Sequence, residues 1–204
     1  MNQDIYLIRH TAPAVEKGIC YGQSDIDVKE SFYDEARIIK TYLPLQIEAV
    51  YSSPLIRCKK LADHLFPKNN VHTQSTLMEI NCGQWEMRHW DHIPKEEIDP
   101  WMQDFVRVCI PGGESYTDLY KRVVHSLNTI IATANNTAIV THGGVIRSML
   151  SYITQTPLID SFKQFSLHYG CVIKITIDGQ NLRHEILSNI PTEKEKHKPG
   201  GNVE

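Results

Sequence analysis

The stretch that decides the fold is Asp4-Ile5-Tyr6-Leu7-Ile8, which is followed at once by Arg9 and His10. It is a short apolar run that ends in polar, chemically active side chains, which is typical of a strand with a functional turn at its end. Further β-like runs follow along the chain. They are Ala49–Tyr51, Ala138–Val140, the β-branched run Cys171–Ile177, and Leu182–Leu187, which can pair with the run before it as a hairpin.

Helical patterns fill the stretches between these runs. Apolar residues recur there at helical spacing, and Ser53-Pro54 is a typical helix start. Strands that alternate with helices predict an α/β sandwich with a mostly parallel sheet. In such a sheet, ligands bind beyond the carboxyl ends of the strands. The predicted helices are Lys29–Tyr42, Pro54–Leu65, Glu96–Val108, Ser115–Ala134 and Gly144–Ile153.

The size and charge of the chain exclude several classes of protein. Its 204 residues suffice for one sizeable core, and we expect a single domain over residues 1–190. The charged tail over residues 191–204 is expected to be disordered. A formal net charge of −3 gives no basic surplus for a nucleic-acid backbone. No segment has the pattern of a signal peptide or a membrane span, so we expect a soluble cytoplasmic protein.

The cysteines carry little functional information. There are five, and no two form a Cys-x-x-Cys pair, which argues against structural zinc and against a complete disulfide framework. We expect free thiols in a reducing compartment, and neither a metal nor another cofactor. Whether the chain forms a homodimer stays open.

Phosphoryl transfer to a protein side chain needs three kinds of group. A neutral nucleophile must reach phosphorus, and histidine, with an ordinary pKa of about 6.5, is largely neutral at cellular pH. Cations must hold the equatorial oxygens, which suits the planar fork of arginine, and an acid must protonate the leaving oxygen. Gly143-Gly144 also leaves the amides of a helix N-terminus open to an anion. The candidates at the predicted sheet edge are Arg9, His10, Arg57, Glu79 and His142.

Each of these pieces alone has a simpler explanation. An Arg-His pair at a strand end is usually a surface pair, and His-Gly-Gly is usually a turn. Single glutamates such as Glu79 and Glu86 are usually solvated. The common position of all these groups at one edge of one sheet favours a shared function.

The same residues form motifs that resemble the histidine phosphatase superfamily, whose members have the phosphoglycerate mutase-like fold. The resemblance implies a three-layer α/β/α sandwich and a phosphomonoesterase. Five motifs occur in the family's order: Leu7-Ile8-Arg9-His10-Thr11, Ser52-Ser53-Pro54-Leu55-Ile56-Arg57, Leu77–Ile80 with Gly83–Glu86, Pro111–Ser115, and Val140–Gly144.

The resemblance also implies roles for the motif residues. His10 attacks phosphorus and becomes a phosphohistidine. Glu79 protonates the leaving oxygen and then assists the attacking water, with Glu86 as its rival. The groups that hold the phosphoryl oxygens are Arg9, Arg57 and His142, with Gly143 beside them. Where the family has Trp-Glu-Gly, this chain has Trp85-Glu86-Met87, so we expect a different loop conformation there, because a residue other than glycine disfavours positive φ.

Two segments resemble the alpha-ribazole 5′-phosphate phosphatases of cobalamin nucleotide-loop synthesis. They are Arg9-His10-Thr11-Ala12-Pro13 and Cys20-Tyr21-Gly22-Gln23-Ser24-Asp25. The resemblance implies that this small-molecule phosphate ester is the substrate. Tyr21 and Gln23 are then candidates for contacting the leaving group, and the alternative is that Tyr21-Gly22 only shapes a turn.

Other functions stay open. The alternatives within the family are a broad-specificity phosphatase and an enzyme similar to phosphoglycerate mutase or fructose-2,6-bisphosphatase. An alternative of another class is a non-catalytic module that binds phosphate ligands, which the presence of all five catalytic positions disfavours. The segment His89–Val108, with Trp90 and Trp101, is either a lid over the leaving group or ordinary packing.

Overall fold

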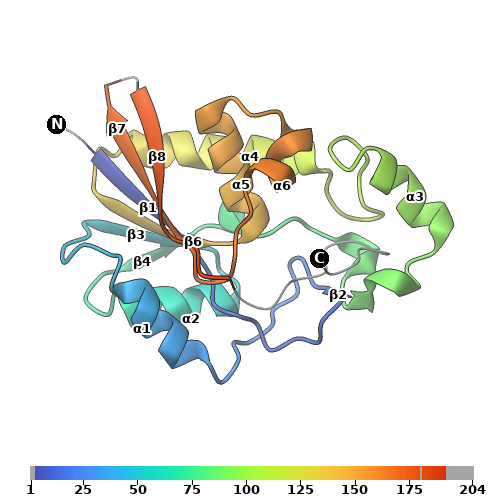
Figure 1. Cartoon of the computed structure of the whole chain (residues 1–204), viewed down its shortest axis with the longest axis horizontal. Helices are drawn as coiled ribbons and strands as arrows, with labels where there is room; N and C mark the ends of the chain where they lie inside the picture. Colours follow the sequence, from blue (N-terminus) through green and yellow to red (C-terminus); the bar gives the residue numbers. More distant parts are fainter. Residues whose placement is uncertain (1–2, 180, 192–204) are drawn as a thin grey trace.

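A six-stranded sheet lies at the centre of the computed structural model, which describes residues 3–179 and 181–191 (Figure 1). The strand order is β4-β3-β6-β1-β7-β8. The first four strands in this order are parallel, and β7 and β8 are antiparallel to their neighbours, so the predicted mostly parallel sheet is confirmed. The strands are β1 (Gln3–Arg9), β3 (Ala49–Ser52), β4 (Val71–Thr73), β6 (Thr137–Thr141), β7 (Val172–Asp178) and β8 (Asn181–Ser188).

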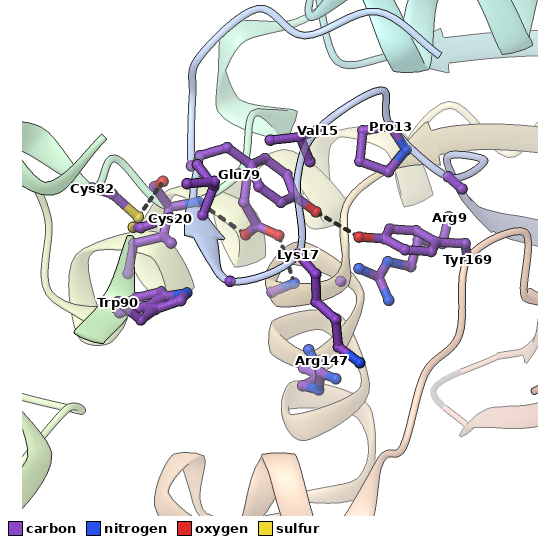
Figure 2. Close-up of a pocket in the computed structure, with 18 of the residues that line it drawn as sticks. Arg9, Pro13, Val15, Lys17, Cys20, Glu79, Cys82, Trp90, Arg147 and Tyr169 are labelled. Atoms are coloured by element: carbon purple, nitrogen blue, oxygen red, sulfur yellow. Dashed lines mark hydrogen bonds between the residues drawn. The ribbon is translucent and has the colours of Figure 1, made fainter. Parts of the chain in front are cut away.

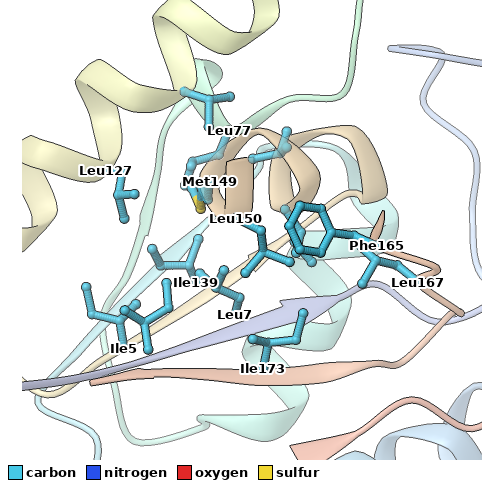
Figure 3. Packing of buried hydrophobic residues seen from close by; sticks show 14 of the residues in the cluster. Ile5, Leu7, Leu77, Leu127, Ile139, Met149, Leu150, Phe165, Leu167 and Ile173 are labelled. Carbon is cyan, nitrogen blue, oxygen red and sulfur yellow. The ribbon is translucent and has the colours of Figure 1, made fainter. Parts of the chain in front are cut away.

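Strand β1 is apolar from Ile5 to Ile8 because both faces of the sheet are covered there. Ile5 and Leu7 point into one core with helices α4 and α5, and Figure 3 shows them beside Ile139 and Leu150. Tyr6 and Ile8, one residue out of phase, belong to the core on the opposite face. A strand buried on both faces reads as a continuous apolar run, which is the pattern of residues 4–8.

Helices form the two outer layers, so the predicted α/β/α sandwich is confirmed. One face of the sheet is covered by α1 and α2, and the other by α4, α5 and α6 (Figure 1). The helix α3 and the two-stranded sheet β2-β5 lie to one side of these layers. The helices are α1 (Phe32–Lys40), α2 (Ile56–Leu65), α3 (Lys95–Gln103), α4 (Tyr116–Ile131), α5 (Gly143–Thr154) and α6 (Ser161–Gln164), and the small strands are β2 (Ile19–Cys20) and β5 (Arg88–His89).

The observed helix boundaries differ from the predicted ones by up to five residues, and two of the differences have a clear physical reason. The helix expected from Pro54 begins at Ile56, because the Asp25 carboxylate accepts the Ile56 N–H at 2.6 Å and caps the helix from another loop. The helix expected to reach Val108 ends at Gln103, because the carboxylate of Asp104 accepts the Arg107 N–H and closes a turn. Strand β4 was not predicted, since it has three residues and only one of them is apolar.

The register of the sheet brings three strand ends together. Arg9 of β1 pairs with Thr141 of β6, and Ser52 of β3 pairs with Val140 of β6. The residues that follow these strands, among them His10 and His142, therefore start from one edge of the sheet.

Within the described residues, no helix is long and apolar enough to cross a membrane. Of the tail predicted over residues 191–204, all but Pro191 lies outside the described residues.

Candidate active site

His10 sits at the carboxyl end of β1 with its imidazole almost completely buried. Its backbone N–H donates to Thr141 O of the neighbouring strand at 3.0 Å. This hydrogen bond holds the backbone at the end of β1 beside β6. The ring nitrogen Nδ1 lies 2.7 Å from Thr11 O. Because a carbonyl oxygen only accepts, Nδ1 must carry the proton, and Nε2 is left with a lone pair. The imidazole is therefore held in the tautomer of a nucleophile.

Two buried arginines flank this histidine. Arg57, from the first turn of α2, donates from Nη1 to Ser24 O at 2.7 Å and from Nη2 to Gly22 O at 2.8 Å. Arg9 donates from Nη1 to Leu167 O at 2.8 Å, and its guanidinium lies 4.3 Å from the centre of the Tyr169 ring. The partners of Arg57 in these hydrogen bonds are neutral carbonyls, so its guanidinium charge is available to an incoming anion.

His142 follows β6 and precedes α5. Its ring lies 5.1 Å from the ring of His10, measured between centroids. Its Nε2 is 2.8 Å from the Ser53 hydroxyl and 3.4 Å from the Cys58 thiol. Ser53 comes from the Ser-Ser-Pro motif after β3, so this hydrogen bond joins two of the three strand ends.

Burial and charge keep both histidines neutral. Loss of solvent lowers the pKa of His10 well below its usual value, and the charges of Arg57 and Arg9 lower it further. The pKa of His142 is lowered for the same reasons, burial first and then Arg57 and His10. A neutral imidazole keeps its lone pair, so the cations that would bind a phosphoryl group also preserve the nucleophile.

The carboxylate of Glu79 lies at the N-terminus of α5. Its Oε2 accepts the Gly144 N–H at 3.1 Å, and its Oε1 accepts the Ile80 N–H at 2.9 Å. The expectation that the Gly144 amide would be open to an outside anion is therefore wrong, because the carboxyl group of Glu79 already accepts its hydrogen bond. A Cβ at position 144 would overlap the Glu79 carboxylate, so a larger residue there would displace this carboxylate.

The Cys20–Asp25 loop holds Arg57 and the backbone of Glu79. Gly22 and Ser24 supply the carbonyls that hold Arg57, and Asp25 caps the helix that carries it. The carboxamide of Gln23 donates to Glu79 O at 2.9 Å, and this side chain is not among those that line the cavity. Tyr21 does line it, and its hydroxyl is 2.9 Å from that of Tyr169. Of the two predicted leaving-group contacts, the structure brings Tyr21 to the cavity and Gln23 to the support of Glu79.

Glu86, the rival acid, is engaged by the same loop. Its carboxylate accepts the backbone N–H of Gln23 at 2.7 Å and that of Cys82 at 3.2 Å, and it also accepts a very short hydrogen bond from the Ser24 hydroxyl. These bonds hold Glu86 as an anchor between two loops. The group that faces the sheet edge is Glu79.

A cavity of about 440 Å³ opens beside these groups. Figure 2 shows Arg9 and Tyr169 on one side of it, Cys82 and Trp90 on the other, and Glu79 between them. The second side is mainly apolar. It is formed by Cys20, Ile80, Cys82, Trp90, Trp101, Phe105, Ile110 and Phe162. The arrangement suits a phosphate ester whose leaving group is largely apolar.

Aromatic residues of the segment His89–Val108 pack against one another and also line this cavity. The rings of Trp90 and Trp101 are stacked at 5.9 Å, and the Trp85 ring packs edge-on against both. Trp85 is anchored in turn, because its Nε1 donates to Glu97 Oε2 at 2.8 Å. The segment thus forms a packed aromatic wall of the cavity.

The backbone conformation at Met87 differs from the one predicted. The loop was expected to change where the family's glycine is replaced, but Met87 keeps a left-handed backbone with φ of 63°. The Met87 N–H donates to Cys20 O at 2.7 Å, and its side chain is exposed. The β2–β5 contact therefore holds the backbone in place despite the cost of positive φ for a residue with a Cβ.

Three residues of the site had no motif to mark them. Tyr169 contacts both Arg9 and the His10 ring, and Arg147 of α5 lines the cavity with its guanidinium 4.4 Å from the centre of the Phe162 ring. Arg122 of α4 binds the backbone around Glu79. Helical spacing offers a weak signal for Arg147, which lies one turn beyond Gly143 on the same face of α5.

The cysteine, histidine and acidic side chains of the described residues form neither a metal-binding group nor a disulfide. Over residues 3–179 and 181–191, no three His, Cys, Asp or Glu side chains are grouped as around a metal ion. All five cysteines are free thiols.

Comparisons with known proteins agree with this geometry. Residues 5–189 match the histidine phosphatase superfamily (branch 1). The adenosylcobalamin/alpha-ribazole phosphatase of Salmonella typhimurium is 25% identical over 182 residues, covering 85% of this chain and 90% of that protein. GpmB of Escherichia coli, a probable phosphoglycerate mutase, is 29% identical over 75% of each chain.

Solved structures share the fold. The alpha-ribazole phosphatase of Shigella flexneri has a TM-score of 0.81 and 23% identity, covering 94% of this chain and 100% of that one. YhfR of Bacillus stearothermophilus has a TM-score of 0.79 and 24% identity, with 93% and 98% covered. The match over residues 5–189 decides the family: this chain belongs to branch 1 of the histidine phosphatase superfamily and is a phosphatase.

Proposed function

We propose that this phosphatase hydrolyses alpha-ribazole 5′-phosphate through a phosphohistidine intermediate on His10. The observation that carries the proposal is the meeting, at one sheet edge, of an imidazole with a free Nε2 lone pair and two buried guanidinium groups. Such a site has a nucleophile and a place for a dianion, which are the requirements of covalent phosphoryl transfer.

In the first step, Nε2 of His10 attacks phosphorus and the bond from phosphorus to the ester oxygen breaks. Arg9, Arg57 and His142 hold the phosphoryl oxygens while charge moves onto the leaving oxygen. Glu79, as the carboxylic acid, gives its proton to that oxygen, so the product leaves as a neutral alcohol.

In the second step, water attacks the phosphorus of the phosphohistidine. The Glu79 carboxylate takes a proton from the water, the P–N bond breaks, and inorganic phosphate is released. His10 returns to its starting tautomer because Thr11 O still holds the proton on Nδ1. One carboxyl group thus serves as acid and then as base.

A buried donor supports the assignment of the phosphate subsite. Nε of Arg57 is buried and has no hydrogen-bond partner among the described residues. An unsatisfied buried N–H is costly, and a phosphoryl oxygen would satisfy it. Binding of a phosphate dianion would also offset the two guanidinium charges.

The apolar side of the cavity supports the choice of substrate. Alpha-ribazole joins ribose to a planar, methylated benzimidazole, which suits a wall built from Trp90, Trp101 and Phe105. The cavity volume of about 440 Å³ is in the range that takes ligands of this size, whereas a three-carbon phosphoglycerate would leave much of it empty. The names of the Salmonella and Shigella relatives favour the same substrate.

The test is a substrate panel with phosphate release measured for each compound. We expect kcat/KM for alpha-ribazole 5′-phosphate to exceed that for ribose 5-phosphate by at least about tenfold, since burial of the base contributes a few kcal/mol. The same preparation carrying His10→Ala serves as the control for contaminating phosphatases. Equal values for the two esters would contradict the proposed substrate, and preferential turnover of a phosphoglycerate or fructose 2,6-bisphosphate would indicate a sibling activity.

A further inference from the structure

The backbone that carries Glu79 is held unusually tightly for an irregular segment. From Thr76 to Glu79, every carbonyl accepts a hydrogen bond from a distant side chain. Arg122 binds Thr76 O at 2.9 Å, Met78 O at 2.7 Å and Glu79 O at 2.9 Å. The hydroxyl of Thr141 binds the remaining carbonyl, Leu77 O, at 2.7 Å.

Arg122 uses all of its donors in this arrangement. A guanidinium has five N–H groups, and three of those of Arg122 go to the carbonyls of residues 76, 78 and 79. The other two go to Glu114, from Nε to Oε1 and from Nη2 to Oε2, both at 2.8 Å. A bidentate pair of this kind fixes the plane of the guanidinium and hence the direction of its three other donors.

Glu114 extends the same network to the far side of the acid. Its Oε2 also accepts the Asn81 N–H at 2.9 Å, two residues after Glu79. The Arg122 and Glu114 side chains are only 19% and 22% exposed, so solvent competes weakly for their hydrogen bonds. Residues on both sides of Glu79 are therefore tied to one ion pair.

We propose that Arg122 and Glu114 are positioning residues that hold Glu79 where it can protonate the leaving oxygen. This inference rests on the proposed role of Glu79 as the acid. Its carboxylate must lie between the Gly144 amide and the substrate, and a shift of about 1 Å in a catalytic group can cost about a hundredfold in rate. Only a single 3-10 turn over Ser75–Leu77 precedes Glu79, so the segment needs such support from outside.

Leaving-group chemistry distinguishes positioning of the acid from general support of the fold. A nitrophenyl phosphate expels a stable phenolate and needs little help from an acid, whereas an alkyl phosphate needs a proton. The parameter kcat/KM reports the steps up to departure of the leaving group, so it isolates this difference. The ratio of kcat/KM for an alkyl phosphate to that for a nitrophenyl phosphate is therefore the quantity to measure.

We expect Arg122→Gln to lower this ratio by about 10-fold to 100-fold, chiefly through the alkyl ester. Glu114→Gln, which is nearly isosteric but places an amide N–H against a donor, should lower it by about 3-fold to 10-fold. Arg37→Gln breaks an exposed ion pair with Asp34 and should leave the ratio unchanged. In a background that carries Glu79→Gln, Arg122→Gln should lower the ratio no further.

Two results would overturn the proposal, and they are distinguishable. If Glu79→Gln lowers the ratio but folded Arg122→Gln and Glu114→Gln reduce both substrates equally, the ion pair only supports the fold. If Glu79→Gln itself leaves the ratio unchanged, Glu79 is not the acid and the proposed function fails at that step. Thermal unfolding of each variant shows that folded protein is being compared.

Discussion

The two ends of the active site are built in different ways. At the phosphate end, His10, Arg57 and His142 come from the ends of regular strands and the start of a helix, and each is at most 1% exposed. At the leaving-group end, the wall comes mainly from short elements and connections outside the central sheet, and Trp90, together with Trp101 of α3, is held there by ring contacts. The strand ends of the sheet therefore position the groups proposed to react with the phosphate. The segments outside the sheet determine the shape of the cavity for the leaving group.

One loop joins the two ends. The Cys20–Asp25 loop gives two carbonyls to Arg57 and one side chain, Tyr21, to the cavity. Its Gln23 side chain binds the backbone of Glu79. A change in this loop would therefore alter substrate fit and phosphate binding together, whereas changes in the aromatic wall should alter substrate fit alone.

The largest effect is expected at the phosphate end. His10→Ala removes the attacking nitrogen, and we expect kcat to fall by at least about a thousandfold with every substrate, because no other side chain can form the intermediate. Phosphate release from several esters measures this. Substantial activity that persists in purified variant protein would show that the two ends have been assigned wrongly.

A selective effect is expected at the leaving-group end. Trp101→Ala opens the aromatic wall, and kcat/KM for alpha-ribazole 5′-phosphate should fall by about tenfold. The value for a small ester such as glycerol phosphate should stay within about twofold, because Trp101 does not bind the phosphate. An equal loss for both esters would mean that the wall also holds the phosphate end in place.

Much of the phosphate end could be predicted from the sequence. Arg9, His10 and His142 follow apolar runs, and parallel strands place such positions at one edge. The leaving-group end could not be predicted, because Trp90 and Trp101 reach the cavity through tertiary packing that no local pattern encodes. The same limit applies to Gln23 and Arg122, whose hydrogen bonds go to backbone carbonyls of the Glu79 segment.

Stability should depend on pH through the phosphate end. The pKa values of His10 and His142 are lowered on folding, so below about pH 6.5 the unfolded chain binds protons that the folded chain does not. The free energy of unfolding should therefore fall as the pH drops below that value. In His142→Gln, urea unfolding at pH 7.5 and 5.5 should show a smaller fall than in the wild type. An equal fall in both proteins would contradict burial of a neutral His142.

The smallest effect is expected at Met87, whose exposed side chain belongs to neither end. Met87→Gly should raise the free energy of unfolding by up to about 1 kcal/mol, since relief of the left-handed strain exceeds the added freedom of the unfolded chain. The Met87 side chain is 55% exposed, so little packing is lost. Thermal unfolding measures the change. A clear loss of stability would mean that the exposed side chain contributes packing.

The central claim is that His10 carries the phosphoryl group. The most direct measurement is rapid acid-free quenching of the enzyme with substrate, followed by mass spectrometry of the peptide that contains residue 10. We predict one added phosphoryl group on His10, stable in base and lost in acid, and its absence when the preparation carries His10→Ala. Turnover with no phosphorylated His10 at any time, or a phosphoryl group on another residue, would contradict the account.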